Sequence, residues 1–330
     1  MENVKVNRKS SYIRGVGSYL PEKLLTSGEL EKRLGLEDGW IEMKTGVAGR
    51  RIAAEGESVS DLAAAAGRVA LAAAGLSPAG LDMIILSSSM GDMFFPSTAC
   101  LVQQKIGAAC PAFDVNNACS GFLHGMAVAS AFINNGTCEN ILVVAAETMS
   151  RMVDWNDYRT CILFGDGAGA FVVSGAGEHR IREYHLGADG AGAEVLKLPG
   201  PGSRFGARPD PAKAGGTVYM EGGEVFRFAM KTIGECVKAA ATKAGVAIRD
   251  IKKIIPHQSN MAIIRESAKI LGVPVETFHV NLNEVGNTAA ASVPLALCDA
   301  VGKERIAPGD TIALVSYGAG LAYASAIVEW

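Results

Sequence analysis

The sequence lacks several features that would each point to a particular class of protein. No stretch reaches about 18 uninterrupted apolar residues, so we expect no membrane-spanning helix and no membrane partner. Residues 1–15 lack the apolar core of a secretory signal peptide. The formal net charge is only −3, so a nucleic acid or an anionic surface is not indicated as a bulk partner either.

Cysteine pairing is also missing from the sequence. The 7 cysteines are an odd number, are scattered along the chain, and include no C-x-x-C pair. A disulfide framework or a zinc site is therefore not expected, and a reducing cytoplasm is the expected location.

What is present is enough material for a large core, with 330 residues of which 49% are hydrophobic. Short apolar runs alternate with alanine-rich segments of helical character. The alternation predicts an α/β fold with mostly parallel central strands. The expected strands are 81–89, 140–147, 170–175, 251–258, 311–318 and 323–330. The expected helices are 60–76 with Ser60 as N-cap, the stretch after Cys119, and 224–245.

The two halves of the chain resemble each other at an offset of about 170 residues. Ile84 and Ile254 lie in matching predicted strands at this offset, and Cys119 matches Asn287 in asparagine-rich turns that precede small-residue helices. We interpret this as a duplicated α/β unit with halves 1–178 and 179–330. A chance resemblance of two α/β halves is the alternative. The Pro- and Gly-rich segment 199–216 is predicted to be a loop.

Cys119 stands where a polar turn gives way to the small-residue run, at a predicted helix start. Unpaired N–H groups and the positive helix end favour the thiolate there and could hold a negative oxygen on a carbonyl. His257 and Asn260 follow one apolar strand, and Asn287 precedes another small-residue helix, so all could meet at strand ends. The alternatives are a packed cysteine, a histidine satisfied by backbone, and an asparagine that only caps a turn.

The motifs "NNACSGF", "IIPHQSN" and "EVGNTAAASVPLAL" resemble, in that order, those of β-ketoacyl-acyl-carrier-protein synthase III. "GVGSYLPE", "DGWIEMKTGV", "FPSTACLVQQKIGA", "LFGDGAGA" and "MEGGEVF" also match, so the resemblance spans nearly the whole chain. It implies a five-layer α/β/α/β/α thiolase fold, a homodimer, and chemistry that needs neither a cofactor nor a metal.

The resemblance also implies roles for individual residues. Cys119 would be the acyl-accepting nucleophile, and His257 with Asn287 would promote malonyl decarboxylation. The backbone N–H groups of Cys119 and Ala319 would form the oxyanion hole. Six residues would bind substrate, with Phe95 reaching the partner subunit's tunnel and Trp40 stacking on adenine: Trp40, Lys44, Phe95, Arg159, Gly222 and Asn260. Arg227 and Lys269 would lie on the carrier-protein face.

The sequence departs from the family pattern at four positions near the substrate. Lys44 replaces an arginine, and Tyr158 takes an arginine position so that Arg159 is displaced by one. Gly223 and Ala262 replace an asparagine and a basic residue. These departures put the identity of the acyl donor in doubt and leave the chemistry intact.

The expected reaction joins an acyl primer from coenzyme A or a carrier protein to malonyl-acyl carrier protein, which initiates fatty acid synthesis. One alternative is a same-fold acyltransferase or secondary-metabolite synthase with another donor or acceptor. A more distant alternative is a nucleotide-binding or redox α/β protein. The loose dinucleotide pattern at Gly165–Ala170 gives that alternative little support, because strand-like residues follow it.

Overall fold

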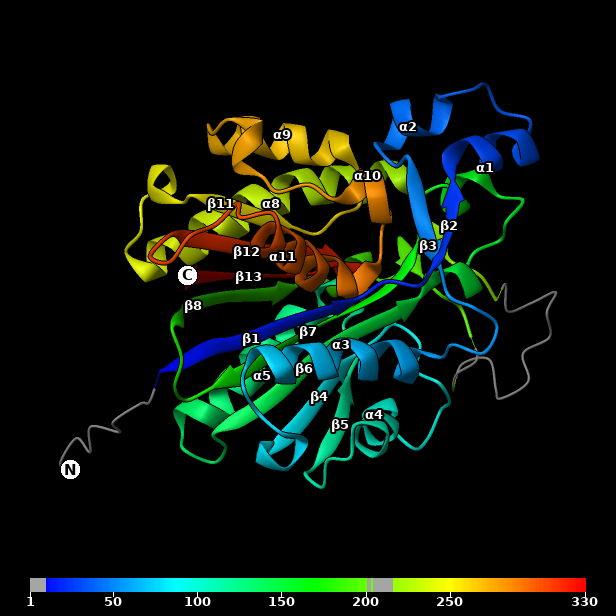
Figure 1. The fold of residues 1–330 in the computed structure, drawn as a ribbon. Helices are drawn as coiled ribbons and strands as arrows, with labels where there is room; N and C mark the ends of the chain where they lie inside the picture. The colour runs from blue at the N-terminus through cyan, green and yellow to red at the C-terminus, as the bar shows by residue number, and fades with distance from the viewer. Residues whose placement is uncertain (1–9, 201–202, 204–215) are drawn as a thin grey trace.

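The computed structural model describes residues 10–200, 203 and 216–330. Most of the loop predicted at 199–216 lies outside these residues. Figure 1 shows α8 and α9 over one side of the molecule and α3 and α4 over the opposite side, with the strands between them.

A nine-stranded sheet in the order β11-β12-β13-β8-β1-β7-β6-β4-β5 forms the framework. Its strands are β1 (Ser11–Tyr19), β4 (Met83–Ser87), β5 (Ala112–Val115), β6 (Asn140–Thr148), β7 (Asp166–Ser174), β8 (His179–Ala188), β11 (Lys253–Pro256), β12 (Thr311–Gly318) and β13 (Ala322–Glu329). Two small sheets pair β2 (Lys23–Thr26) with β3 (Gly49–Ile52), and β9 (Leu196–Lys197) with β10 (Tyr219–Met220).

The strand directions correct the expectation of a mostly parallel sheet. β4 pairs in parallel with β5 and β6, and β11 pairs in parallel with β12. The other five pairings of the sheet are antiparallel. Strands covered on both faces are apolar throughout whatever their direction, so the sequence pattern could not separate the two arrangements.

The principal helices are α1 (Ser27–Leu34), α2 (Trp40–Thr45), α3 (Val59–Ala73), α4 (Thr98–Ile106), α5 (Gly121–Asn134), α8 (Gly222–Ala244), α9 (Met261–Leu271) and α11 (Ser292–Gly302). Short helices are α6 (Tyr158–Cys161) and α10 (Leu282–Val285). Ser58, not Ser60, caps α3 in a capping box with Asp61. Ser60 lies inside the first turn, and its hydroxyl donates to Asp92.

The two halves of the sheet form two layers, and the helices form one layer between them and one on each outer side. These are the five layers that the resemblance implied. Alternate residues of one strand face different helices: Ile85 packs with Phe122 of α5 in the middle layer, whereas Ile84 packs with Leu62 of α3 outside. On the other side, Ile254 packs with Ile233 of α8 in the second outer layer. Each fully buried aliphatic side chain of this kind contributes roughly 1.5–3 kcal/mol to folding.

Strand order repeats in the two halves of the chain. The first half runs β5-β4-β6-β7-β1 and the second runs β11-β12-β13-β8, and the two join where β1 pairs with β8. In the second half, Phe278 pairs in parallel with Ile254 of β11 through an isolated bridge. This bridge occupies the position that β5 has beside β4 in the first half. We infer from this order that residues 1–178 and 179–330 are repeats of one unit.

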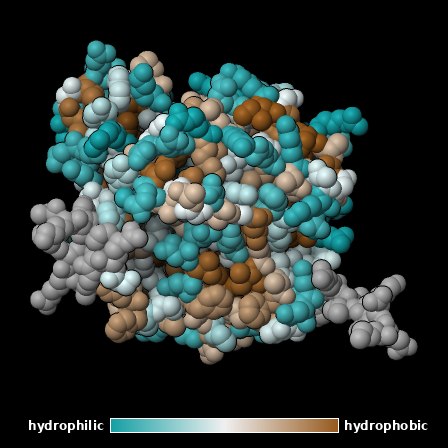
Figure 2. All heavy atoms as spheres, turned by 180° about the vertical axis from the view of Figure 1, so that it is seen from behind, coloured by the Kyte–Doolittle hydropathy of each residue, from teal (hydrophilic) through white to brown (hydrophobic). Residues whose placement is uncertain are grey.

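The surface seen from behind carries apolar side chains in separate patches among hydrophilic ones (Figure 2). Within the described parts of the chain, no helix is both long enough and apolar enough to cross a membrane.

Candidate active site

The predicted catalytic residues follow two strands and precede two helices, and they line one pocket of about 280 Å³. Cys119 lies in a 3₁₀ turn, η2 (Ala118–Ser120), between β5 and α5. His257 directly follows β11, and Asn287 precedes the 3₁₀ turn η7 (Ala289–Ala291) that leads into α11. Cys119, His257 and Asn287 all line this pocket, so residues about 170 positions apart share one site.

The turn that carries Cys119 is held tightly from the second half of the chain. Ala118 has φ of 44°, a left-handed conformation that is unfavourable for a residue with a side chain. Ser316 Oγ on β12 donates a 2.6 Å hydrogen bond to the Cys119 carbonyl oxygen. A Cβ atom on Gly318 would lie 2.8 Å from the Cys119 nitrogen, so only glycine lets β12 end this close.

The resting state of the Cys119 thiol differs from the sequence expectation. Burial, and then the carboxylate of Glu147, raise the pKa of Cys119 to about 12. The residue is still partly accessible from the pocket, although protein surrounds it densely. The thiolate expectation considered only the helix start; the dominant effects here are desolvation and a neighbouring negative charge. Cys119 also lies before α5, which begins at Gly121, and not within its first turn.

His257 is a buried, neutral imidazole with one ring nitrogen occupied. Its Nδ1 lies 2.6 Å from Ser292 Oγ at the start of α11. The backbone N–H of Gln258 donates to the same Oγ at 3.4 Å. With Nδ1 engaged by Ser292, Nε2 is the ring nitrogen that remains for a ligand. Burial lowers the pKa of His257 to about 3, and the Tyr317 ring packs edge-on at 5.1 Å.

The side-chain amide of Asn287 is oriented by its own turn. Its Oδ1 accepts a 2.9 Å hydrogen bond from the Ala289 N–H. The Asn287 N–H donates to the Leu163 carbonyl oxygen, and the Asn287 carbonyl oxygen accepts from the Gly165 N–H, so residues 163–165 hold its backbone. With the oxygen engaged, the Nδ2 hydrogens are the groups that can donate to a ligand.

Five of the six predicted substrate-binding residues line the same pocket: Trp40, Lys44, Arg159, Gly222 and Asn260. Asn260 is already engaged, because it caps α9 through Ala262 and donates from Nδ2 to the Lys44 carbonyl oxygen at 3.3 Å. Arg159 makes a bidentate ion pair with Asp157 at 2.8 and 2.9 Å.

Trp40, which lines the pocket, is one of an aromatic pair. The rings of Trp40 and Tyr158 meet edge to face, with centroids 5.9 Å apart and planes at 81°. Tyr158 is half exposed and stands at the position where the family pattern has arginine. Beside Trp40 the chain therefore has a second ring where the family pattern has a guanidinium.

The remaining predicted residues lie outside this pocket. Ala319 lines a second pocket of about 220 Å³, together with Cys119. Phe95 is 82% exposed on the loop before α4. Arg227 and Lys269 are exposed on α8 and α9, and each is ion-paired one turn earlier, with Glu224 and Glu266 respectively.

Glu147, Ser292 and Tyr317 also lie at the site and were not predicted from the sequence. Glu147 lies at the end of β6 with 0% exposure, and its carboxylate accepts hydrogen bonds from Ser88, Ser89 and Ala290. Burial raises its pKa to about 7. A glutamate that closes an apolar strand run was the available signal, because ligand sites form at the carboxyl ends of strands.

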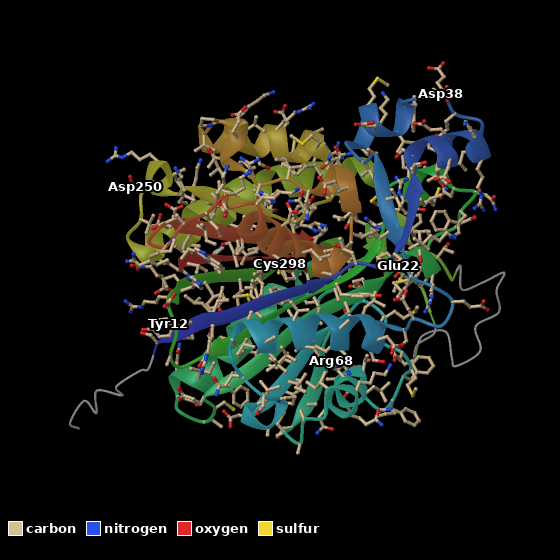
Figure 3. All side chains as sticks on the ribbon, viewed as in Figure 1. Tyr12, Glu22, Asp38, Arg68, Asp250 and Cys298 are labelled. Carbon is tan, nitrogen blue, oxygen red and sulfur yellow. The ribbon has the colours of Figure 1, made fainter. Side chains whose placement is uncertain are left out.

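Other residues that the sequence set aside have structural partners. His124 bonds through Nδ1 to the Ser120 carbonyl oxygen, and Gly165–Ala170 runs into strand β7 without a following helix. Figure 3 labels Cys298 on α11, in the middle layer. Within residues 10–200, 203 and 216–330, no group of three or more His, Cys, Asp or Glu side chains could hold a metal ion.

Comparison with known proteins identifies the family to which this framework belongs. The family model described as 3-oxoacyl-[acyl-carrier-protein] synthase III matches residues 113–197, and its C-terminal companion matches residues 241–330. The β-ketoacyl-[acyl-carrier-protein] synthase III of Caldanaerobacter subterraneus subsp. tengcongensis is 45% identical over 324 residues, covering 96% of this chain and 97% of that protein. The chain belongs to the 3-oxoacyl-[acyl-carrier-protein] synthase III family.

Solved structures agree with this assignment. The synthase III from Thermus thermophilus superimposes with a TM-score of 0.91 at 40% identity, covering 97% of this chain and 99% of that one. A priming β-ketosynthase from the R1128 polyketide biosynthetic pathway also gives 0.91, at 32% identity and 98% and 97% coverage. The predicted family, five-layer fold and acyltransferase class are confirmed, and the nucleotide-binding or redox alternative is wrong.

Proposed function

We propose that this protein is an acyltransferase that condenses an acyl primer thioester with malonyl-acyl carrier protein. The product is a 3-oxoacyl-acyl carrier protein, the first condensation product of fatty acid synthesis. The observation that carries the proposal is the common pocket of Cys119, His257 and Asn287, in a member of the synthase III family.

In the first half-reaction, the Cys119 sulfur attacks the thioester carbonyl carbon, and the bond to the carrier sulfur breaks. A resting thiol suits this step, because one proton leaves Cys119 and one is needed by the departing carrier thiol. The backbone N–H groups of Cys119 and Ala319 would hold the negative oxygen of the tetrahedral intermediate. The close approach that Gly318 permits brings these two segments together.

In the second half-reaction, malonyl loses CO₂ and its bonding electrons form an enolate on the thioester. The Nε2–H of His257 and the Nδ2–H of Asn287 would donate to the enolate oxygen. Both donors are neutral, so neither needs a counter-charge when the site is empty. The enolate carbon then attacks the acyl-enzyme carbonyl carbon, the carbon–sulfur bond breaks, and the departing Cys119 thiolate takes up a proton from solvent.

The donor of the primer is open between coenzyme A and a carrier protein. Among the described residues that line the pocket, the cationic side chains are Lys44 and Arg159, and Arg159 is already paired with Asp157. This favours recognition of the pantetheine arm over recognition of the nucleotide. A secondary-metabolite synthase remains the second candidate, supported by the 32% identity to the R1128 priming β-ketosynthase.

A homodimer and a cytoplasmic location complete the proposal. Met93, Phe94 and Phe95 are 53%, 64% and 82% exposed on one loop, an apolar cluster that a second copy of the chain would cover. All seven cysteines are free thiols, which suits a reducing compartment.

Intact mass spectrometry tests the function directly. The protein is incubated with a panel of acyl-coenzyme A and acyl-carrier-protein thioesters, and then with malonyl-acyl carrier protein. We expect an acyl mass increment on Cys119 that disappears as a 3-oxoacyl carrier protein forms. An increment that is transferred to another acceptor without CO₂ release would favour the second candidate. Absence of any increment would contradict both.

A further inference from the structure

Glu31 on α1 is a buried carboxylate whose two oxygens both accept backbone hydrogen bonds. Its exposed fraction is only 2%. Oε2 accepts from the Gly39 N–H at 3.0 Å, and Oε1 accepts from the Ile41 N–H at 2.7 Å. These two N–H groups lie on either side of Trp40, which lines the pocket that Cys119 also lines. The carboxylate therefore holds the chain on both sides of a pocket residue.

The start of α2 needs acceptors from outside the helix, because the first N–H groups of a helix have no partner within it. Gly39, the N-cap of α2, has φ of 79° and no side chain that could cap the helix. The adjacent Asp38 is exposed, and its side chain points away from the molecule (Figure 3). The Trp40 N–H donates to the Glu37 carbonyl oxygen at 3.1 Å. Glu31 supplies the acceptors for the N–H groups before and after it.

Different contacts hold the two ends of α2. Near its C-terminal end, the Lys44 carbonyl oxygen accepts from Asn260 Nδ2 at 3.3 Å. Its start packs against α1, where Leu30 and Ile41 are buried in one apolar cluster. Apolar contacts are not directional, whereas hydrogen bonds are. The two bonds to Glu31 are therefore the contacts that orient the start of α2.

The charge of Glu31 suits this role. Burying a carboxylate is costly unless hydrogen bonds compensate, and hydrogen bonds to an ionised acceptor are roughly twice as strong as neutral ones. Ser27, one turn earlier on the same face of α1, accepts from Nη2 of the buried Arg50 at 3.3 Å. A positive charge therefore lies along the same buried face of α1 as the carboxylate.

We propose that Glu31 is a positioning residue for the acyl donor, because its two hydrogen bonds fix the Trp40 indole at the pocket where the arm of the donor lies. The inference rests on the proposed function, since it takes this pocket as the path of the donor to Cys119. Glu31 itself does not contact the donor. Its effect passes through Trp40 and is confined to donors long enough to reach the indole.

The test measures acylation of Cys119 by intact mass spectrometry at increasing donor concentration, which gives a limiting rate and a half-saturating concentration. An acyl-pantetheine thioester is compared with an acyl-N-acetylcysteamine thioester, whose arm is shorter. In Glu31→Gln, a single amide oxygen replaces two carboxylate oxygens. We expect the half-saturating concentration of acyl-pantetheine to rise about fivefold, with a limiting rate within about twofold. For the shorter donor, both quantities should stay within about twofold.

Two further variants complete the comparison. Glu31→Asp keeps the charge but is one methylene shorter, so it cannot reach both N–H groups. It should cause the same selective loss, and it carries the test if Glu31→Gln does not fold. Glu29→Gln is the matched control, because Glu29 also lies on α1 and accepts a backbone N–H, from Thr26 at 2.8 Å, but is exposed. It should behave as the unmodified protein. Equal losses in Glu31→Gln and Glu29→Gln, or equal losses for both donors, would overturn the inference.

A double variant shows whether Glu31 acts through the indole. If it does, Glu31→Gln should add nothing to the change in half-saturating concentration that Trp40→Ala causes by itself. A second, independent rise in the double variant would assign Glu31 a role that bypasses Trp40, and would contradict the proposal.

Fluorescence separates failure of this inference from failure of the proposed function. Acrylamide quenching of Trp40, taken as the difference between each protein and its Trp40→Phe counterpart, needs no acyl chemistry. It should become more efficient in Glu31→Gln and stay unchanged in Glu29→Gln. If Cys119 is acylated but Glu31→Gln alters neither quenching nor donor dependence, only the role of Glu31 is lost. If no thioester acylates Cys119 in the unmodified protein, the proposed function fails, and the donor role of Glu31 fails with it.

Discussion

The Nδ1 atom of His257 lies 2.6 Å from Ser292 Oγ, so the first residue of α11 fixes the ring that follows β11. The contact joins two elements that flank the pocket and leaves Nε2 as the ring nitrogen that can meet a ligand. A neutral donor at Nε2 is the form that enolate stabilisation requires.

Ser292→Ala should slow decarboxylation about tenfold, the effect of losing one net hydrogen bond of about 1–1.5 kcal/mol. Acylation of Cys119 should stay within about twofold, because His257 is not needed to hold the first oxyanion. Release of labelled CO₂ and the acyl mass increment measure the two steps. Ser130→Ala is the matched control, since Ser130 is also buried in a helix but bonds Ser11 and Tyr184, neither of which lines the pocket. Equal losses in both variants would assign Ser292 a purely structural role.

His257 should make the protein more sensitive to acid. Its pKa is lowered to about 3 in the folded state, against 6.5 in the unfolded chain. Between these values only the unfolded state binds the proton, so stability is full above pH 6.5 and falls as pH drops below it. From pH 7.5 to pH 5, unmodified protein should lose about 2 kcal/mol more unfolding free energy than His257→Gln. Urea titrations at both pH values measure this. The same loss in both proteins would show that His257 is protonated in the fold.

Gly318→Ala should impair acylation selectively. The new Cβ would lie 2.8 Å from the Cys119 nitrogen and 3.1 Å from its Cβ, so the turn and β12 must separate. Displacing one oxyanion donor costs about 10²–10³ in rate. Gly302→Ala is the control, because nothing lies within 4 Å of a Cβ built there. The rate of the acyl mass increment is compared in both variants. Normal acylation in Gly318→Ala would remove Ala319 and the Cys119 N–H from the proposed oxyanion hole.

The catalytic efficiency should depend little on the nucleotide part of coenzyme A. The ratio of kcat/KM for acyl-coenzyme A to that for a short acyl-pantetheine thioester should stay below about tenfold, or roughly 1.4 kcal/mol. Tyr158→Arg, which adds a guanidinium beside Trp40, should raise the ratio. A large ratio in the unmodified protein that Trp40→Ala abolishes would mean that the ring pair binds adenine as it stands.

Much of the fold could be predicted because its strands are buried on both faces. Ile84 and Ile85 point to different helix layers, so the run around them is apolar without interruption and is recognisable. Strand direction could not be predicted, since antiparallel β7 and parallel β4 show the same pattern. Ser58 replaced Ser60 as the cap of α3 because helix boundaries depend on local hydrogen bonds.

The site was predictable where chemistry and position coincide in the sequence. Cys119, His257 and Asn287 each follow or precede a clear apolar run. Their environment was not predictable: the pKa of Cys119 depends on burial and on Glu147, a residue from another strand. Nothing local distinguishes a glutamate that closes a strand in the core from one that reaches solvent.

The division of labour between the half-reactions is tested most directly by Asn287→Ala. Its Oδ1 accepts from the Ala289 N–H, so Nδ2 is the group left to donate to a ligand. Truncation should remove one of the two proposed enolate donors while the Cys119 turn keeps its own contacts. Stopped-time mass spectrometry of acylation and labelled CO₂ release are measured on the same preparation. We expect acylation at a near-normal rate and decarboxylation about 10²–10³ slower, a loss of roughly 3–4 kcal/mol. Folded Asn287→Ala protein that loses acylation as severely as decarboxylation, or loses neither, would contradict the account.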